Sequence, residues 1–286
     1  MAGSSWALEV FGLEQQEDDW PGMAVENKLI MGTTELFQRL KNRFQPPLWL
    51  FRFLARNKPK FECPVCVYQG PFEDMDSFAG RRRHVRCPQC GALERHRLQY
   101  LVVMELFKGL NVSSMTMLHF APEPFLKNIF ARRFARYETA DLTMKGVDHQ
   151  VDLQSLPFAD GSYDFVFASH VLEHVPNDKK AIQEIRRILK PNGLAVLPVP
   201  VVCPQTIEYP EANPHEAYHV RAPGLDYFEK YKPLFARVET HTSDSFPQKY
   251  QVHIYEDRSV WPTKKCPLRP PMAGEKHIDV VPVCYV

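Results

Sequence analysis

Between residues 98 and 200, short apolar runs alternate with segments whose apolar residues recur at helical spacing. The runs predict strands at residues 115–121, 137–142, 147–151, 163–168 and 194–199. The helical spacing predicts helices at residues 98–106, 124–135 and 178–189. Strands that alternate with helices are typical of a mostly parallel sheet with helices on both faces. We therefore expect an α/β domain, which we place at residues 98–257.

The chain has a different pattern on either side of this alternation. Residues 1–58 are amphipathic, which predicts an N-terminal helical segment that either packs on the main domain or moves as a lid over a substrate. Residues 235–240 and 250–255 are predicted to form a final antiparallel strand pair. Residues 258–286 hold several prolines without a clear period, so we expect an irregular C-terminal tail.

The composition limits the classes of function. Hydrophobic residues make up 44% of the chain and charged residues 24%, as in an ordinary globular protein. The formal net charge of +1 gives no global basic field of the kind that nucleic-acid binders often carry. No apolar run reaches the roughly 18 residues of a membrane span, and the N-terminus lacks the pattern of a signal peptide. We expect a cytoplasmic protein without a membrane span.

Four of the seven cysteines form two Cys-Pro-x-Cys pairs, Cys63 with Cys66 and Cys87 with Cys90. A structural zinc ion needs four soft ligands, and two such turns supply four thiolates. The other cysteines are scattered, so the pattern indicates a metal site in a reducing compartment and no disulfide framework. We therefore predict a small zinc-ribbon module at residues 59–97 that holds a structural Zn²⁺.

Residues 152–175 read DLQSLPFADGSYDFVFASHVLEHV, and residues 184–193 read EIRRILKPNG. Together they resemble the class I S-adenosylmethionine-dependent methyltransferases. The cysteine pairs, the ERHR sequence at residues 94–97 and the LHFAPE sequence at residues 118–123 are similar to a subfamily with an N-terminal zinc ribbon. The resemblance covers residues 115–200 and implies a Rossmann-like sheet, S-adenosylmethionine as cofactor and methyl transfer as the reaction.

Acidic and polar residues stand at the predicted strand ends, where an open parallel sheet binds its ligand. Asp141 would accept hydrogen bonds from the ribose hydroxyls, and Asp152 would accept one from the adenine amino group. Ser169 and His170 would line the methionine end of the cofactor. The alternative for the two aspartates is a local role in capping their loops. The cofactor contacts expected in all are Phe120, Ala121, Glu123, Asp141, Leu142, Asp152, Leu153, Ser169 and His170.

The loop after the first predicted strand reads HFAPEP and contains no glycine, although this fold normally carries a glycine-rich turn there. Such a loop suits a pyrophosphate poorly, which argues against NAD, but it can serve a cofactor without phosphate. Phe120 and Leu153 would sandwich the adenine. The missing glycine also leaves open a non-catalytic binding protein built on a decayed methyltransferase fold.

Histidines supply the candidate general bases for methyl transfer. His170 ranks first because it follows the strand at residues 163–168, and His119 and His219 are the other candidates. A packing or capping role is the alternative for His170. The YHVRAPG sequence at residues 218–224 resembles a segment of the same subfamily that builds the substrate pocket. The predicted substrate contacts are His219, Arg221 and Tyr209.

These features predict a methyltransferase that acts on an oxygen, nitrogen or sulfur of a small molecule, and the near-neutral charge favours this class of substrate. The alternative is an RNA methyltransferase whose zinc ribbon and nearby arginines contact phosphates. Those arginines form either a solvated surface or an anion contact. They are Arg81, Arg82, Arg83 and Arg86.

Overall fold

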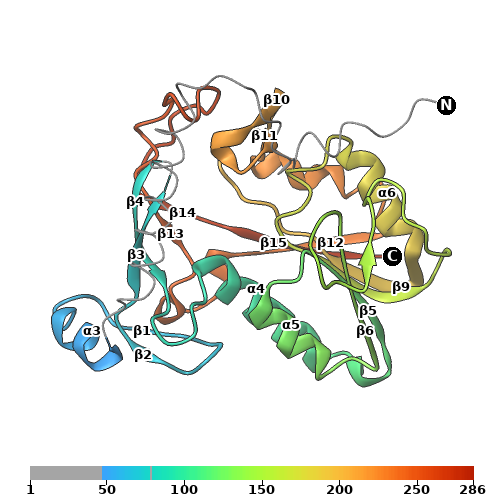
Figure 1. The fold of residues 1–286 in the computed structure, drawn as a ribbon, viewed down its shortest axis with the longest axis horizontal. Helices are drawn as coiled ribbons and strands as arrows, with labels where there is room; N and C mark the ends of the chain where they lie inside the picture. The colour runs from blue at the N-terminus through green and yellow to red at the C-terminus, as the bar shows by residue number, and fades with distance from the viewer. Residues whose placement is uncertain (1–46, 78) are drawn as a thin grey trace, which may run out of the picture. The chain divides into compact units, whose positions relative to one another are not determined.

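The computed structural model describes residues 47–77 and 79–286 (Figure 1). The chain divides into two compact units, Met1–Lys58 and Pro59–Val286. The described part of the first unit contains the helix α3 (Leu48–Leu54). Most of the predicted N-terminal helical segment, and with it the proposed lid, lies outside the described residues.

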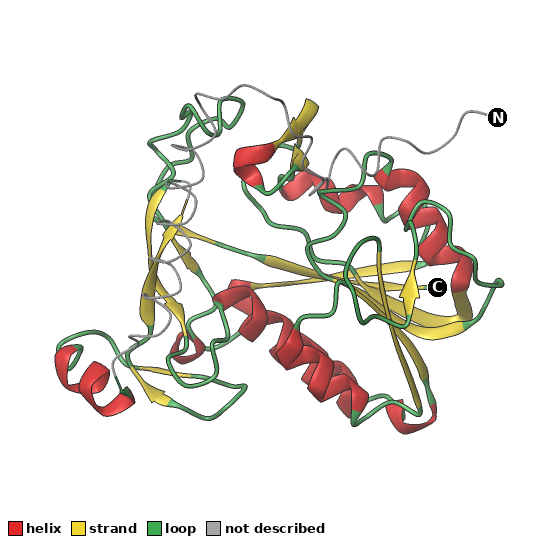
Figure 2. Ribbon diagram, in the orientation of Figure 1, coloured by secondary structure: helices red, strands yellow, loops and turns green. Residues whose placement is uncertain are grey.

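A seven-stranded sheet forms the centre of the second unit, with the strand order β12-β15-β9-β8-β5-β6-β7. Strands are drawn in yellow in Figure 2. Five neighbouring strands run parallel, namely β5 (Thr116–Phe120), β6 (Arg136–Asp141), β7 (His149–Gln150), β8 (Tyr163–Ala168) and β9 (Leu189–Val196). β15 (Val280–Tyr285) is antiparallel to both of its neighbours, β9 and β12 (Arg237–Thr242). The expected α/β, Rossmann-like sheet is confirmed, and each parallel strand overlaps the segment predicted for it.

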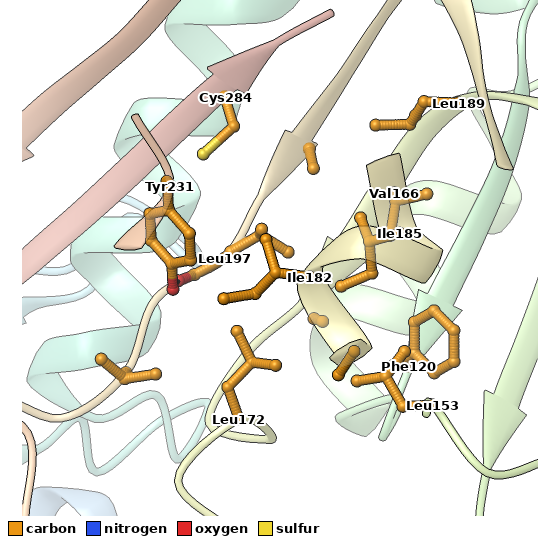
Figure 3. Packing of buried hydrophobic residues seen from close by; sticks show 14 of the residues in the cluster. Phe120, Leu153, Val166, Leu172, Ile182, Ile185, Leu189, Leu197, Tyr231 and Cys284 are labelled. Atoms are coloured by element: carbon orange, nitrogen blue, oxygen red, sulfur yellow. The ribbon is translucent and has the colours of Figure 1, made fainter. Parts of the chain in front are cut away.

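Helices pack on both faces of this sheet because successive strand residues point to opposite sides. Phe165 and Phe167 of β8 belong to the buried cluster that contains the apolar residues of α4 and α5. Val166 and Ala168 belong to the cluster that contains the apolar face of α6, part of which Figure 3 shows. These helices are α4 (Glu94–Lys108), α5 (Pro124–Ala131) and α6 (Asp178–Ile188).

The C-terminal segment forms a central strand, so the prediction of an irregular tail is wrong for residues 280–285. The prediction of a strand pair between residues 235–240 and 250–255 is also wrong, because β12 pairs with β15 along its whole length. The misleading signal is Pro282, since proline normally interrupts a central strand. Its missing N–H is tolerated because β15 is paired with β9 only from Val283 onward.

The cysteine-rich region and the C-terminal region share a smaller sheet with the order β14-β13-β4-β3. Tyr255 of β13 pairs with Arg83 of β4, so a strand near the end of the chain continues the sheet of the cysteine-rich region. Residues 59–97 therefore belong to the same compact unit as the central sheet. The strands of this region are β1 (Phe61–Glu62), β2 (Gln69–Gly70), β3 (Glu73–Ser77), β4 (Gly80–Arg86), β13 (Ile254–Tyr255) and β14 (Lys276–His277).

A hairpin of β10 (Ile207–Asn213) and β11 (His219–Ala222) follows the parallel strands along the chain. The short 3-10 helices are η1 (Val112–Ser114), η2 (Pro214–Glu216), η3 (Leu225–Lys230), η4 (Ser243–Ser245) and η5 (Gln248–Tyr250). In the part of the chain that the structure describes, no helix has both the length and the apolar character needed to cross a membrane.

Candidate functional site

The four cysteines of the predicted ribbon come together as a set of sulfur ligands. All four Sγ atoms lie within 4.8 Å of one another, and the Sγ–Sγ distances Cys63–Cys90 and Cys66–Cys87 are 3.6 Å. A disulfide would hold its sulfurs about 2 Å apart. Thiolates about 2.3 Å from one tetrahedral zinc ion lie roughly 3.8 Å apart. The donor set and its spacing therefore fit Zn²⁺.

Two matching turns position these thiols. The N–H of Val67 donates to the carbonyl of Cys63, and the N–H of Gly91 donates to the carbonyl of Cys87, each at 2.9 Å. Both closing residues have a left-handed backbone, with φ of 57° for Val67 and 76° for Gly91. Glycine adopts this conformation without steric cost, whereas a side chain opposes it. The same backbone geometry therefore builds both halves of the site.

The arginines between the cysteine pairs are engaged in ion pairs. Each of the four lies between 2.5 and 2.9 Å from a carboxylate oxygen. The positive charge of this surface is therefore balanced locally by carboxylates. The pairs are Arg81–Asp74, Arg82–Glu94, Arg83–Glu275 and Arg86–Glu73.

The ERHR sequence begins α4 and ties the cysteine-rich region to the rest of the unit. The buried guanidinium of Arg97 lies over the ring of Phe72, 4.3 Å from its centre, and donates to four backbone carbonyls. Burial lowers the pKa of Arg97 to about 10, so the group is still charged at neutral pH. The acceptors lie in β4, in the second cysteine turn and before β13; they are Val85, Ala92, Tyr250 and Gln251.

Arg95 and His96 of the same helix bind Glu123, which lies in the loop after β5. Oε1 of Glu123 is 3.0 Å from Arg95 and 2.8 Å from Nε2 of His96. Burial alone would raise the pKa of Glu123, but the bond with His96 and the charge of Arg95 outweigh it and hold the pKa at about 2. Oε2 is buried and has no hydrogen-bond partner among the described residues. Glu123 therefore keeps one ionised oxygen available.

Two strained residues follow β5 and β8, the adjacent strands at the switch point of the sheet. Ala121 directly follows β5 with a φ of 46°, and His170 is the second residue after β8 with a φ of 55°. Residues other than glycine rarely adopt this left-handed conformation, and such residues concentrate at functional sites. Ala121 thus provides a turn of the glycine type in a loop that has no glycine.

Asp141 and Asp152, which lie at or just beyond the ends of β6 and β7, cap their own loops. Oδ1 of Asp141 accepts the N–H groups of Thr143 at 2.8 Å and Met144 at 2.7 Å. Both oxygens of Asp152 accept hydrogen bonds from Gln154. The capping alternative therefore holds for both residues. Oδ2 of Asp141 accepts no hydrogen bond from a described residue, so this oxygen can still serve a ligand.

The structure does not present Phe120 and Leu153 as the two faces of an adenine slot. Both side chains lie in the core cluster with α6 (Figure 3), and their exposed fractions are only 2% and 5%. The expectation was misleading because apolar residues at strand ends serve the core as readily as a ligand. Leu142, in contrast, exposes 39% of its surface next to Asp141 and presents an apolar side chain at this edge of the sheet.

Ser169, directly after β8, bonds to α4. Its Oγ donates to Oε1 of Gln99 at 3.2 Å, and both residues are buried. Nε2 of Gln99 is buried without an acceptor among the described residues. The motifs did not reveal Gln99. Its signal is a polar residue on the buried side of α4, between the apolar Leu98 and Val102.

A fully buried carboxylate and three histidines meet where the segment after β8 contacts β11. Nδ1 of His170 lies 3.3 Å from Oε1 of Glu173, and the rings of His174 and His219 meet edge to face with centroids 4.7 Å apart. Burial opposes ionisation of Glu173, but the neighbouring imidazoles, His170 foremost, bring its pKa below the ordinary value. Burial lowers the pKa of His219 to about 4, so its imidazole is neutral at pH 7.

Arg221 and Tyr209 make contacts within the protein where substrate contacts were expected. The buried guanidinium of Arg221 bonds to Glu208 and to three backbone carbonyls, and these bonds use four of its five N–H donors. The predicted substrate contact of Arg221 is therefore corrected to a structural one. Tyr209 donates to Glu216 at 3.0 Å and lines a hollow of about 330 Å³ beside residues 210–214. The three carbonyls are those of Leu172, Val175 and Pro176.

His119 is a core residue. It is fully buried, its Nδ1 lies 2.8 Å from the hydroxyl of Tyr137, and its ring packs edge to face with Phe130 and Phe167. Burial lowers its pKa to about 3. The interpretation of His119 as a general base is therefore wrong, because the group is enclosed by aromatic rings.

Comparison with known families identifies the middle of this unit. Residues 127–197, which run from within α5 to just beyond β9, match the model of a methyltransferase domain. This segment of the chain is similar to a methyltransferase domain. The matched segment includes four of the five parallel strands in full, β6 to β9, together with His170, Glu173 and His174 of the polar cluster. The matched segment thus contains the part of the sheet that ends in Ser169 and His170.

Several methyltransferases are similar to parts of the chain. An uncharacterized methyltransferase of Mycobacterium sp. (strain KMS) is 54% identical over 43 residues, which cover 15% of this chain and 17% of that protein. The demethylmenaquinone methyltransferase of Bacillus velezensis is 34% identical over 83 residues, 29% of this chain and 30% of that protein. The chain therefore matches less than a third of the length of these curated relatives.

A distant likeness to solved structures also exists. The S-adenosylmethionine dependent methyltransferase of Mesorhizobium loti is 14% identical, covers 63% of this chain and 96% of its own, and gives a TM-score of 0.43. The strand order of the sheet, and not this likeness, establishes the fold of the second unit.

Proposed function

We propose that this chain is an S-adenosylmethionine-dependent methyltransferase that acts on an oxygen, nitrogen or sulfur of a small molecule, and that its cysteine site holds a structural Zn²⁺. One observation carries the proposal. The switch point of the sheet in a methyltransferase domain brings two strained residues, Ala121 and His170, together with buried polar atoms that lack partners among the described residues. Polar groups buried without partners are rare in native proteins and mark places where a ligand or water completes the structure.

The residues at the strand ends fit an adenosine cofactor with a charged methionine end. Oδ2 of Asp141 would accept from a ribose hydroxyl while Oδ1 keeps the loop in place. Nε2 of Gln99 would donate to the methionine carboxylate, which would satisfy an amide that is otherwise buried alone. The available oxygen of Glu123 would accept from the methionine amino group. When bound, S-adenosylmethionine supplies a methyl group on a positively charged sulfur.

His170 is the proposed general base. Its Nδ1 faces the carboxylate of Glu173 at 3.3 Å, which favours the tautomer that carries its proton on Nδ1. Nε2 is then a proton acceptor, and it is buried without a partner among the described residues. The carboxylate would stabilise the imidazolium that forms when Nε2 takes a proton from the acceptor group of the substrate. The polar cluster therefore has the parts that general-base catalysis requires.

Calorimetric titration with S-adenosylhomocysteine tests cofactor binding. We expect the wild-type protein to bind one equivalent and Asp141→Asn to bind about tenfold more weakly, because a charged hydrogen bond contributes about 1.5 kcal/mol or more. The asparagine keeps the oxygen that caps the loop and loses only the charged acceptor. Asp257→Asn is the matched control, since Asp257 is exposed and also caps a turn through Oδ1. Absence of binding to the wild-type protein would refute the proposal and favour the non-catalytic alternative.

Methyl transfer from labelled S-adenosylmethionine into a broad metabolite extract tests the base. His170→Asn is expected to lower transfer about 100-fold, the typical contribution of a general base. Asparagine tolerates the left-handed backbone of this position, so the loop is retained. The affinity of His170→Asn for S-adenosylhomocysteine should stay within about threefold of the wild-type value. His215 is an exposed histidine, so the control variant His215→Asn should transfer methyl groups as the wild type does. Full transfer by His170→Asn would exclude this residue as the base.

The two alternative functions find less support. The arginines that an RNA methyltransferase would direct to phosphates are engaged by carboxylates. A decayed fold was suggested by the glycine-free first loop, but Ala121 adopts the left-handed conformation that such a loop needs. Both observations favour the small-molecule methyltransferase.

A further inference from the structure

A second group of metal-type ligands lies in the segment after β8, separate from the cysteines. Glu173, His174 and His219 each offer one ligand atom, and these atoms lie within 4.8 Å of one another. Glu173 and His174 belong to the segment after β8, and His219 begins β11. We propose that these three residues bind a divalent first-row transition-metal ion, in addition to the zinc ion proposed at the cysteine site.

The carboxylate of Glu173 is the observation that points to a cation. The residue is fully buried, and neither carboxylate oxygen has a hydrogen-bond partner among the described residues. His170 contacts Oε1 only at an ion-pair distance of 3.3 Å. A buried carboxylate without hydrogen bonds is costly unless a cation balances its charge. A metal ion bound by Glu173 and by the imidazoles of His174 and His219 would supply that cation.

Backbone contacts hold the two ligand-bearing segments together. The N–H of Val220 donates to the carbonyl of Glu173 at 3.0 Å, so β11 runs directly against the segment after β8. The guanidinium of Arg221 donates to three more carbonyls of that segment. The residues next to His219 are therefore fixed, and His219 stays beside Glu173. Ligands on a backbone held in this way are what a metal site requires.

The donor set indicates the class of metal. Zinc, cobalt, nickel and iron(II) accept imidazole together with carboxylate, whereas magnesium and calcium prefer oxygen ligands alone. Ligand atoms about 2.1 Å from one tetrahedral ion lie roughly 3.4 Å apart. The three atoms, which lie within 4.8 Å of one another, would therefore move slightly inward around an ion. Three protein ligands leave one coordination position open, as in catalytic and not in structural zinc sites.

The zinc content of the whole protein tests this inference without any substrate. The protein is loaded with Zn²⁺, freed of excess metal by gel filtration and analysed by elemental mass spectrometry. We expect two zinc ions per chain in the wild-type protein and one in His219→Ala. His215→Ala should hold two zinc ions. It is the matched control because His215 is an exposed histidine in the turn between β10 and β11, four residues before His219.

A wild-type protein that holds one zinc ion per chain would overturn the inference, and so would a His219→Ala protein that holds two. Glu173→Gln is the second variant, for the case that His219→Ala does not fold. It keeps the shape of the side chain, removes its charge and is also expected to hold one zinc ion. The inference does not rest on the proposed methyl transfer, and the affinity of each variant for S-adenosylhomocysteine reports separately on the cofactor site.

Discussion

At the scale of single residues, distant partners set the charge state of the groups in the site. The carboxylate of Glu123 is held ionised by Arg95 and His96, which lie on another element. The pKa of Glu173 is lowered by His170 in its own segment and by His219 of β11. Burial opposes ionisation in both cases, and nearby cationic or hydrogen-bonding groups decide the outcome.

The Glu123 ion cluster gives a prediction about pH. Its folded-state pKa of about 2 lies below the ordinary value of 4.5, so its stabilisation is fully present above the unfolded-state pKa and is lost as the pH falls towards 2. A shift of this size corresponds to about 3 kcal/mol at neutral pH. The free energies of denaturant unfolding of the wild type and Glu123→Gln should therefore differ at pH 7 and converge as the pH falls from about 4.5 towards 2. A difference that does not change with pH would contradict this role.

At the scale of elements, α4 connects the regions that build the site. Arg97 binds carbonyls of β4, of the second cysteine turn and of the segment before β13. Arg95 reaches the loop after β5, and Gln99 reaches Ser169 after β8. One helix therefore holds the cysteine-rich region against two of the strand ends that the cofactor is proposed to contact.

Arg97→Met tests this connection. Methionine keeps apolar contact with Phe72 but leaves buried carbonyls without donors, so we expect a loss of about 3 kcal/mol or more in the free energy of unfolding. Arg132→Met, at an exposed position, should change the stability by less than about 0.5 kcal/mol. The measurement is denaturant unfolding of both variants. Equal stability of the two would show that Arg97 does not connect these regions.

At the scale of the whole second unit, the cysteine site and the central sheet form one body. β4 lies between the cysteine pairs in the sequence and pairs with β13, which lies between β12 and β15 of the central sheet along the chain. The smaller sheet therefore connects the cysteine-rich region to the C-terminal half of the second unit. We therefore expect loss of metal at the cysteines to destabilise parts of the second unit outside residues 59–97.

Metal removal tests this coupling. A strong chelator is expected to lower the melting temperature by about 10 °C, because a structural zinc ion contributes directly to the free energy of folding. Renewed Zn²⁺ should restore the melting temperature. Thermal unfolding is measured by circular dichroism. The protein used is His219→Ala, which is expected to hold zinc only at the cysteine site, so that chelation removes the metal from that site alone. A melting temperature that does not respond to chelation would contradict a structural metal at the cysteines.

The sequence by itself determined the features that depend on local pattern. Short apolar runs predicted the five parallel strands, because a buried strand needs consecutive apolar side chains. The spacing within each Cys-Pro-x-Cys turn predicted the sulfur ligands, because one turn already brings two thiols together. Residues at the strand ends could be named as site candidates, since parallel strands end at the same edge of a sheet.

Only the tertiary structure decided which distant segments meet. It inserted β15 between β9 and β12, paired the arginines of the cysteine-rich region with carboxylates, and assigned Arg221 to the segment after β8. It also brought His219 to Glu173 and His174. The spacing of residues along the chain does not predict these contacts. Strand pairing and buried ion pairs depend on burial and hydrogen bonding between segments that are remote in the sequence.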